Sequence, residues 1–149
     1  MMKITSERVI NCEPSVVFEY ISNFENNPIW QGGMIEASFT STGPLGEGST
    51  YDQVATFLGK KIITSFVVSR FERNRCIQIQ SIRSTFPIKV TRSVERAEGG
   101  TLVSAFVEGD PGGIFKLAKP LLKRMVQRSV VNDYANLKTI LEDQCSKSN

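Results

Sequence analysis

The order of the predicted elements is the feature that most constrains the fold of this chain. A helical stretch spans Pro14 to Trp30, a long succession of strands follows, and one amphipathic helix extends from about Gly113 to Glu142. A single long helix must bury its apolar stripe, and here only the preceding strands can cover it. We therefore expect a curved sheet around one terminal helix, an arrangement that tends to leave a pocket between the two.

Seven strand-length segments are rich in Val, Ile, Thr, Phe or Tyr. The first opens the chain and ends before Glu13 and Pro14. Short separators of the hairpin type divide the other six. These six segments are Met34 to Thr42, Ser49 to Leu58, Lys61 to Glu72, Cys76 to Ser84, Ile88 to Ala97 and Thr101 to Glu108. The pattern predicts an α+β fold with a curved, seven-stranded antiparallel sheet.

Two short helices are expected after the first strand. Apolar residues recur at steps of three and four after Pro14, Asn26 to Pro28 break the helix, and a short turn then carries Ile29 and Trp30. In the last helix the apolar residues step by four, so their stripe drifts around a straight helix. This drift predicts a bend or a curved partner, and Pro120 would supply the bend.

Length and charge favour one soluble domain. At 149 residues the chain forms one core, with the domain over residues 1–143 and a polar tail over 144–149. The net charge of +3 gives no strong field for nucleic acid, which is excluded as an expected partner. We find no apolar run long enough for a signal peptide or a membrane span, so the predicted location is the cytoplasm.

The three cysteines, Cys12, Cys76 and Cys145, are widely spaced and odd in number. This pattern predicts reduced thiols in a cytosolic protein, with Cys145 incidental in the polar tail. The chain has no histidine and no paired cysteines at zinc-ligand spacing. We therefore predict neither a metal site nor a cofactor.

The element order and a set of apolar and glycine positions resemble a known family over nearly the whole chain. The chain is similar to the START-like (SRPBCC) superfamily with its helix-grip, Bet v 1-like fold, and within it to the polyketide cyclase/dehydrase group. The positions that carry the resemblance are fold-making residues: Pro14, Val17, Phe18, Ile21, Phe24, Pro28, Trp30, Gly46, Gly48, Gly100, Thr101, Leu137, Lys138, Leu141 and Glu142. The resemblance implies a deep, mainly apolar cavity between the sheet and the last helix, suited to a hydrophobic small molecule.

Strand alternation selects the side chains that would face this cavity. Arg92 stands out, because it shares an inward row with Ile88, Val90 and Val94. A guanidinium in such a place needs water, a carboxylate or a polar ligand group. Three explanations stay open: an anchor for a ligand, an internal ion pair, or a register shift of one residue that turns Arg92 to solvent.

Other candidates for ligand contact are Tyr51, Gln53 and Ser81 as polar groups, Phe66 in an apolar row, and Trp30 as a lid over the pocket mouth. Ordinary core packing accounts for Phe66 and Trp30 more readily than ligand contact does.

The function predicted from these features is binding of a lipid, polyketide or quinone-like molecule. One alternative is a metal-independent cyclase/dehydratase, although the lack of histidine and of a convincing acid–base pair leaves no catalytic residue to name. Another is a membrane or protein interaction module that uses the hairpin tip at Arg70 to Arg75 and the lysines of the last helix. A solvated face explains those lysines, Lys116, Lys119 and Lys123 among them, more simply than an anionic membrane does, yet peripheral membrane contact stays open.

Overall fold

The structure, a computed structural model, describes residues 2–110, 112 and 119–147. Its elements in chain order are β1 (Met2–Ile10), α1 (Pro14–Ser22), the 3-10 helix η1 (Phe24–Asn26), α2 (Asn27–Trp30), β2 (Met34–Phe39), β3 (Thr50–Phe57), β4 (Lys60–Glu72), β5 (Cys76–Arg83), β6 (Ile88–Ala97), β7 (Gly100–Gly109) and α3 (Lys119–Lys147).

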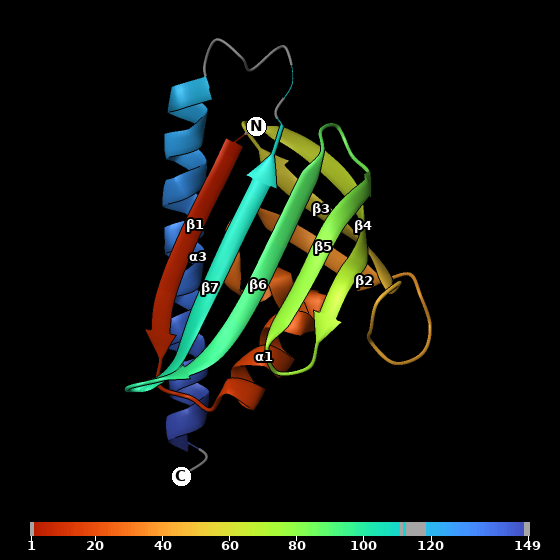
Figure 1. Cartoon of the computed structure of the whole chain (residues 1–149). Coiled ribbons are helices and arrows are strands. Elements are labelled where there is room, and N and C mark those ends of the chain that lie inside the picture. The colour runs from red at the N-terminus through yellow and green to blue at the C-terminus, as the bar shows by residue number, and fades with distance from the viewer. Residues whose placement is uncertain (1, 111, 113–118, 148–149) are drawn as a thin grey trace.

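The strands form one 7-stranded antiparallel sheet in the order β1-β7-β6-β5-β4-β3-β2. Every pair of neighbours is consecutive in the chain except β1 and β7, as short hairpins require. The register of β4 against β5 shifts twice, between Ser65 and Phe66 and between Val68 and Arg70, and such bulges increase the bend of a strand. Figure 1 shows the sheet curling around α1 and α3. The predicted helix-grip α+β fold is confirmed.

The strand boundaries agree closely with the prediction, and Ile88–Ala97 agrees at both ends. The clearest difference is β2, which ends at Phe39 rather than at Thr42. Both Thr40 N and Ser41 N donate to the same acceptor, Thr50 O, so the regular ladder stops there.

The predicted helix break at Asn26 to Pro28 is wrong in position. α1 ends at Ser22, because Asn23 adopts extended backbone and its side chain accepts a hydrogen bond from Glu25 N to open η1. Asn27 and Pro28 then begin α2, since proline in the first turn of a helix costs no backbone bond.

α3 differs from its prediction at the C-terminal end. It continues through Lys147, beyond the expected end at Glu142. The expected start at Gly113 and the lysine at position 116 lie outside the described residues. Pro120 is the second residue of the described helix, so the bend at Pro120 stays a prediction.

The main core lies between the concave face of the sheet, α1, α2 and the C-terminal half of α3. Its most buried large side chains include Phe24, Trp30, Tyr51, Phe66, Ile77, Leu137 and Leu141. A smaller cluster joins Met2 and Ile4 of β1 to Leu122 in the N-terminal half of α3. The inward rows predicted from strand alternation are confirmed, with Arg92 among them.

The expectation of three reduced cysteines is corrected. Cys12 and Cys145 form a disulfide, with their Cα atoms 5.9 Å apart, and only Cys76 is free. The two cysteines are separated by 133 residues, so only the folded chain brings them together. Because disulfides persist mainly in oxidising compartments, the cysteines no longer argue for the cytoplasm. That location stays a prediction.

A close approach of backbones marks the same end of the sheet. Gly100 has a φ of 134°, and a Cβ placed on it would collide with the Ile10 carbonyl. Thr101 Oγ1 donates to Cys12 O over 2.6 Å, which ties the chain after β1 to β7 beside the disulfide. Among the described helices, none is long and apolar enough to cross a membrane.

Candidate functional site

A cavity of about 280 Å³, here called the apolar chamber, lies between the sheet and the N-terminal half of α3. Inward residues of five strands and two residues of α3 supply most of its apolar lining, because alternate residues of each strand face the concave side. They are Met2, Ile4, Ala55, Phe57, Ile62, Ile88, Val107, Leu122 and Val126.

A second cavity of about 160 Å³, here called the Arg92 chamber, adjoins the first. The two share Met34, Gln53, Ile88, Val107 and Asp133 in their linings. Tyr51, Arg92 and Tyr134 line only the Arg92 chamber. An apolar space thus lies beside one that carries polar groups.

Arg92 is 4% exposed and is held by neutral groups. Its Nη1 donates to Ile21 O over 2.8 Å and to Asn27 Oδ1 over 3.3 Å, and its guanidinium carbon lies 4.9 Å from the centre of the Trp30 ring. Among the described residues, none bonds to Nε, and no carboxylate lies within ion-pair distance of the guanidinium. The register-shift and ion-pair explanations therefore fail, and a buried cation is left beside a cavity.

Asp133 is a residue of this site that the sequence analysis missed. It is 8% exposed, lines both chambers, and its Oδ1 accepts a hydrogen bond from Gly32 N over 2.9 Å. Burial raises the pKa of Asp133 to about 6, although the Gly32 hydrogen bond and the charge of Arg92 lower it. The sequence does carry a signal for Asp133, because this residue lies four positions before the buried Leu137 and therefore falls on the apolar stripe of α3.

Tyr51 places a hydroxyl without a described partner in the same chamber. The residue is 1% exposed, and its ring stacks between Phe24 and Phe66, at centroid distances of 4.2 and 5.0 Å. No described group bonds to its Oη, and burial raises the pKa of the phenol. A buried hydroxyl of this kind normally bonds to a water or a ligand.

The other predicted site residues divide into two groups. Gln53 and Phe66 line the Arg92 chamber, and Gln53 Oε1 accepts from Asn27 Nδ2 over 3.3 Å. Trp30 is not a lid, because it is 1% exposed and packs edge-on against Tyr134 behind the chamber wall. Ser81 lines neither chamber, and its Oγ instead accepts from Ile88 N to close the β5–β6 turn.

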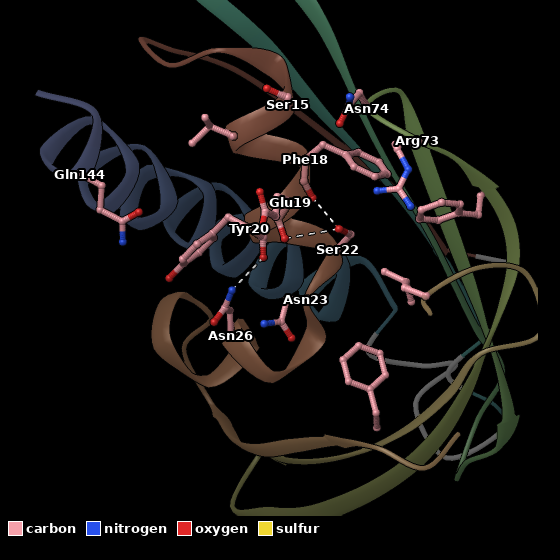
Figure 2. A pocket seen from close by; sticks show the side chains of 14 residues that line it. Ser15, Phe18, Glu19, Tyr20, Ser22, Asn23, Asn26, Arg73, Asn74 and Gln144 are labelled. Carbon is pink, nitrogen blue, oxygen red and sulfur yellow. Dashed lines mark hydrogen bonds between the residues drawn. The ribbon is translucent and has the colours of Figure 1, made fainter. Parts of the chain in front are cut away.

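A larger, open cleft of about 750 Å³ lies between α1 and the tip of the β4–β5 hairpin. Figure 2 shows its floor, where Ser22 Oγ donates to Phe18 O over 2.7 Å and Asn26 Nδ2 donates to Tyr20 O over 3.1 Å. These polar groups are already paired. The joined chambers, with unpaired buried groups, are therefore the better candidate site.

The donor set of the chambers suits an organic ligand. The described residues contain no cluster of three or more His, Cys, Asp or Glu side chains that could hold a metal ion. The apolar chamber can take a hydrocarbon or aromatic body, Arg92 and Tyr51 can donate to an oxygen of the ligand, and Asp133 can accept or release a proton near pH 6.

Comparison with protein families gives a match over residues 1–142, to the model described as "Polyketide cyclase / dehydrase and lipid transport". No curated protein sequence matches the chain significantly.

Solved structures share the architecture at low sequence identity. The chain is similar to protein TTHA0849 of Thermus thermophilus, with a TM-score of 0.81, 16% identity and coverage of 92% of this chain and 94% of that one. It is also similar to a START superfamily protein of Mycobacterium smegmatis, with a TM-score of 0.71, 14% identity and full coverage (100%) of both chains. The Zhui aromatase/cyclase of Streptomyces sp. R1128 gives a TM-score of 0.74 at 10% identity, covering 94% of this chain and 93% of that one. At these identities the likeness establishes the fold alone.

Proposed function

Because the chain belongs to the polyketide cyclase/dehydrase and lipid transport family, we propose that it binds a hydrophobic or aromatic small molecule in its joined chambers. The ligand has an apolar body of lipid, polyketide or quinone type and a polar oxygen at one end. The apolar body occupies the apolar chamber, and the oxygen accepts hydrogen bonds in the Arg92 chamber.

One observation carries this proposal: two buried donors, Arg92 Nε and Tyr51 Oη, have no partner among the described residues and belong to side chains that line a cavity. An unsatisfied buried donor costs free energy, and one on a cation costs more. A ligand oxygen would remove that cost. The modest chamber volumes favour a compact ligand over a large one.

The fluorescent aromatic anion 1-anilinonaphthalene-8-sulfonate tests the proposal. The wild-type protein should bind it saturably, and Ala55→Phe, which fills the apolar chamber, should weaken binding by about tenfold or more. Val54→Phe, on the outward face of the same strand, is the matched control and should bind as the wild type does. Near-UV circular dichroism checks that each variant stays folded. Equal binding by both variants would overturn the proposal.

Arg92→Gln tests the polar end of the site. It should weaken binding of the sulfonate probe by about tenfold or more, while the neutral probe N-phenyl-1-naphthylamine should lose about twofold or less. A parallel loss for both probes would show that Arg92 only supports the fold.

Asp133 favours a second candidate, a cyclase/dehydratase-like enzyme. Its pKa of about 6 suits proton transfer near neutrality, and it lines the same chamber as Arg92 and Tyr51. Asp133→Asn should then abolish turnover of a polyketide-type β-ketone while leaving probe binding intact. Turnover that survives this substitution would remove Asp133 as the proton carrier.

A further inference from the structure

The basic residues of α3 gather in its N-terminal half. Lys119, Lys123, Arg124 and Arg128 fall within residues 119–132, which contain no acidic side chain. In contrast, residues 133–147 hold three acidic side chains and two lysines: Asp133, Lys138, Glu142, Asp143 and Lys147. One helix therefore carries a positive half and a nearly neutral half.

Apolar side chains are exposed within this positive half. Leu121 is 61% exposed and Met125 is 42% exposed. Together with Arg124 and Arg128 they line a groove of about 590 Å³, here called the α3 groove. Single exposed apolar residues are common on protein surfaces, but here two lie one helical turn apart beside two arginines.

Helix stability does not explain this arrangement. Arg124 and Arg128 are four residues apart, as are Lys119 and Lys123, and like charges at that spacing destabilise a helix. The ion pairs among the described residues involve none of these four cations. A solvated face, the simplest explanation of the lysines, accounts for the charges but not for the exposed Leu121 and Met125 between them.

We propose that the α3 groove and its basic surroundings form a docking surface for an anionic lipid bilayer. Cations next to exposed aliphatic side chains match a surface of anionic headgroups above hydrocarbon. The groove also reaches Gly32, Ser129 and Asp133, all of which line the apolar chamber on the other side. A bilayer bound at the α3 groove would therefore lie next to the wall of the apolar chamber.

Vesicle co-sedimentation tests this proposal with the full chain. Wild-type protein should bind phosphatidylcholine vesicles that contain about 30 mol% phosphatidylserine and should not bind vesicles of phosphatidylcholine alone. High salt should weaken the binding. Arg124→Glu/Arg128→Glu should lower the partition coefficient about tenfold or more, and Leu121→Ser/Met125→Ser should remove the part of the binding that resists salt.

Arg70→Glu/Arg73→Glu is the matched control, because it makes the same change of net charge on the β4–β5 hairpin. It should change vesicle binding by about twofold or less. An equal loss in this control, or no binding of the wild type, would overturn the proposal. Retention of the wild type on immobilised polyglutamate without vesicle binding, lost in Arg124→Glu/Arg128→Glu, would overturn it in favour of an acidic protein partner.

The docking surface and the ligand chambers can fail separately. Vesicle binding is measured without a ligand in the chambers, so a lack of vesicle binding would leave the ligand proposal in place. Loss of probe binding in Ala55→Phe likewise leaves the docking surface untouched.

Discussion

The two halves of α3 are held to the rest of the molecule in different ways. The C-terminal half buries Leu137 and Leu141 completely and carries the disulfide to Cys12. Glu142 Oε2 also accepts from Asn11 N over 2.8 Å, close to where Figure 1 shows the end of β1 beside α3. The N-terminal half instead covers the apolar chamber, and Asp133 and Tyr134, where the two halves meet, line the Arg92 chamber, so that an ionisable group lies in the buried stripe. The helix is anchored at one end and spans a cavity at the other.

This difference explains how the fold can keep a cavity. Empty volume and unsatisfied polar atoms reduce stability, and two such atoms, Arg92 Nε and Tyr51 Oη, belong to side chains that line the Arg92 chamber. The cross-link and the fully buried Leu137 and Leu141 lie nearer the C-terminal end of α3, and no described residue of this helix after Tyr134 lines either chamber. Stability and binding thus depend on different parts of one helix, and the following changes test that separation.

Loss of the disulfide should have the largest effect. Cys145→Ser opens a covalent loop that joins residues 133 positions apart, so the unfolded chain gains conformational freedom. We expect the free energy of unfolding to fall by about 2–5 kcal/mol, measured by urea denaturation. Dithiothreitol should destabilise the wild type by a similar amount and should not destabilise Cys145→Ser further. Equal sensitivity of both proteins to the reductant would contradict the cross-link.

Truncation of a buried leucine should cost more in the anchored half than over the cavity. Leu137 is fully buried in the main core, so Leu137→Ala should lower the free energy of unfolding by about 3–4 kcal/mol. Leu122 is also buried but borders the apolar chamber, so Leu122→Ala should cost less, about 2 kcal/mol. Urea denaturation of the two variants measures the difference, and equal losses would show that the N-terminal half is packed as tightly as the C-terminal half.

Asp133 should make the protein less stable at neutral pH than at pH 4. Its pKa is about 6 in the folded chain and 3.8 ordinarily, so the folded state binds more protons between these values. The free energy of unfolding therefore falls as pH rises from about 4 to 6, by about 1–3 kcal/mol in total. Asp133→Asn removes this titration and can still accept the Gly32 hydrogen bond. The variant should be more stable than the wild type above pH 6 by this amount and nearly equal to it at pH 4.

An exposed carboxylate on the same helix provides the control for this titration. Asp143→Asn should change stability by about 0.5 kcal/mol or less across the pH range, because Asp143 is exposed and makes only a surface ion pair. A pH profile of Asp133→Asn parallel to that of the wild type would mean that Asp133 titrates alike in the folded and unfolded chains.

The fold could be predicted because its signals are local. Two-residue alternation, hairpin separators and apolar steps of three and four each act within a few residues, and they also placed Arg92 on the concave face. The break at Asn23 was missed because it depends on one side-chain hydrogen bond, which competes with the helix. Asn26 to Pro28 carry equally strong signals for a turn, but here Asn26 ends η1 and Asn27 and Pro28 begin α2.

The site could be predicted only in part, because it depends on distant pairings. Cys12 meets Cys145, and Gly32 meets Asp133, only after the chain folds. Alternation gives the direction of Arg92 but not the neutral groups that hold it. The position of Trp30 behind the chamber wall depends on how α2 packs against α3, which no short pattern in the chain encodes.

A small effect is expected from the polar contacts at the anchored end. Hydrogen bonds from Asn11 N and from Lys138 lower the pKa of Glu142 below its ordinary 4.5. A lowered pKa means that this stabilisation is present above the ordinary value and is lost as pH falls through the folded value. Because the pair with Lys138 is partly exposed, Glu142→Gln should cost only about 0.5–1 kcal/mol in urea denaturation at pH 7.

Lys147→Gln tests whether that small effect belongs to the contact between α3 and the end of β1 or to surface charge in general. It breaks an ion pair with Asp143 at the same spacing on the same helix, but this pair is more exposed, and Asn11 N donates to Glu142 rather than to Asp143. Its loss should cost about 0.3 kcal/mol or less. If both variants lost the same amount, the Glu142 contact to Asn11 would add nothing, and the disulfide with the buried leucines would account for the anchoring of α3.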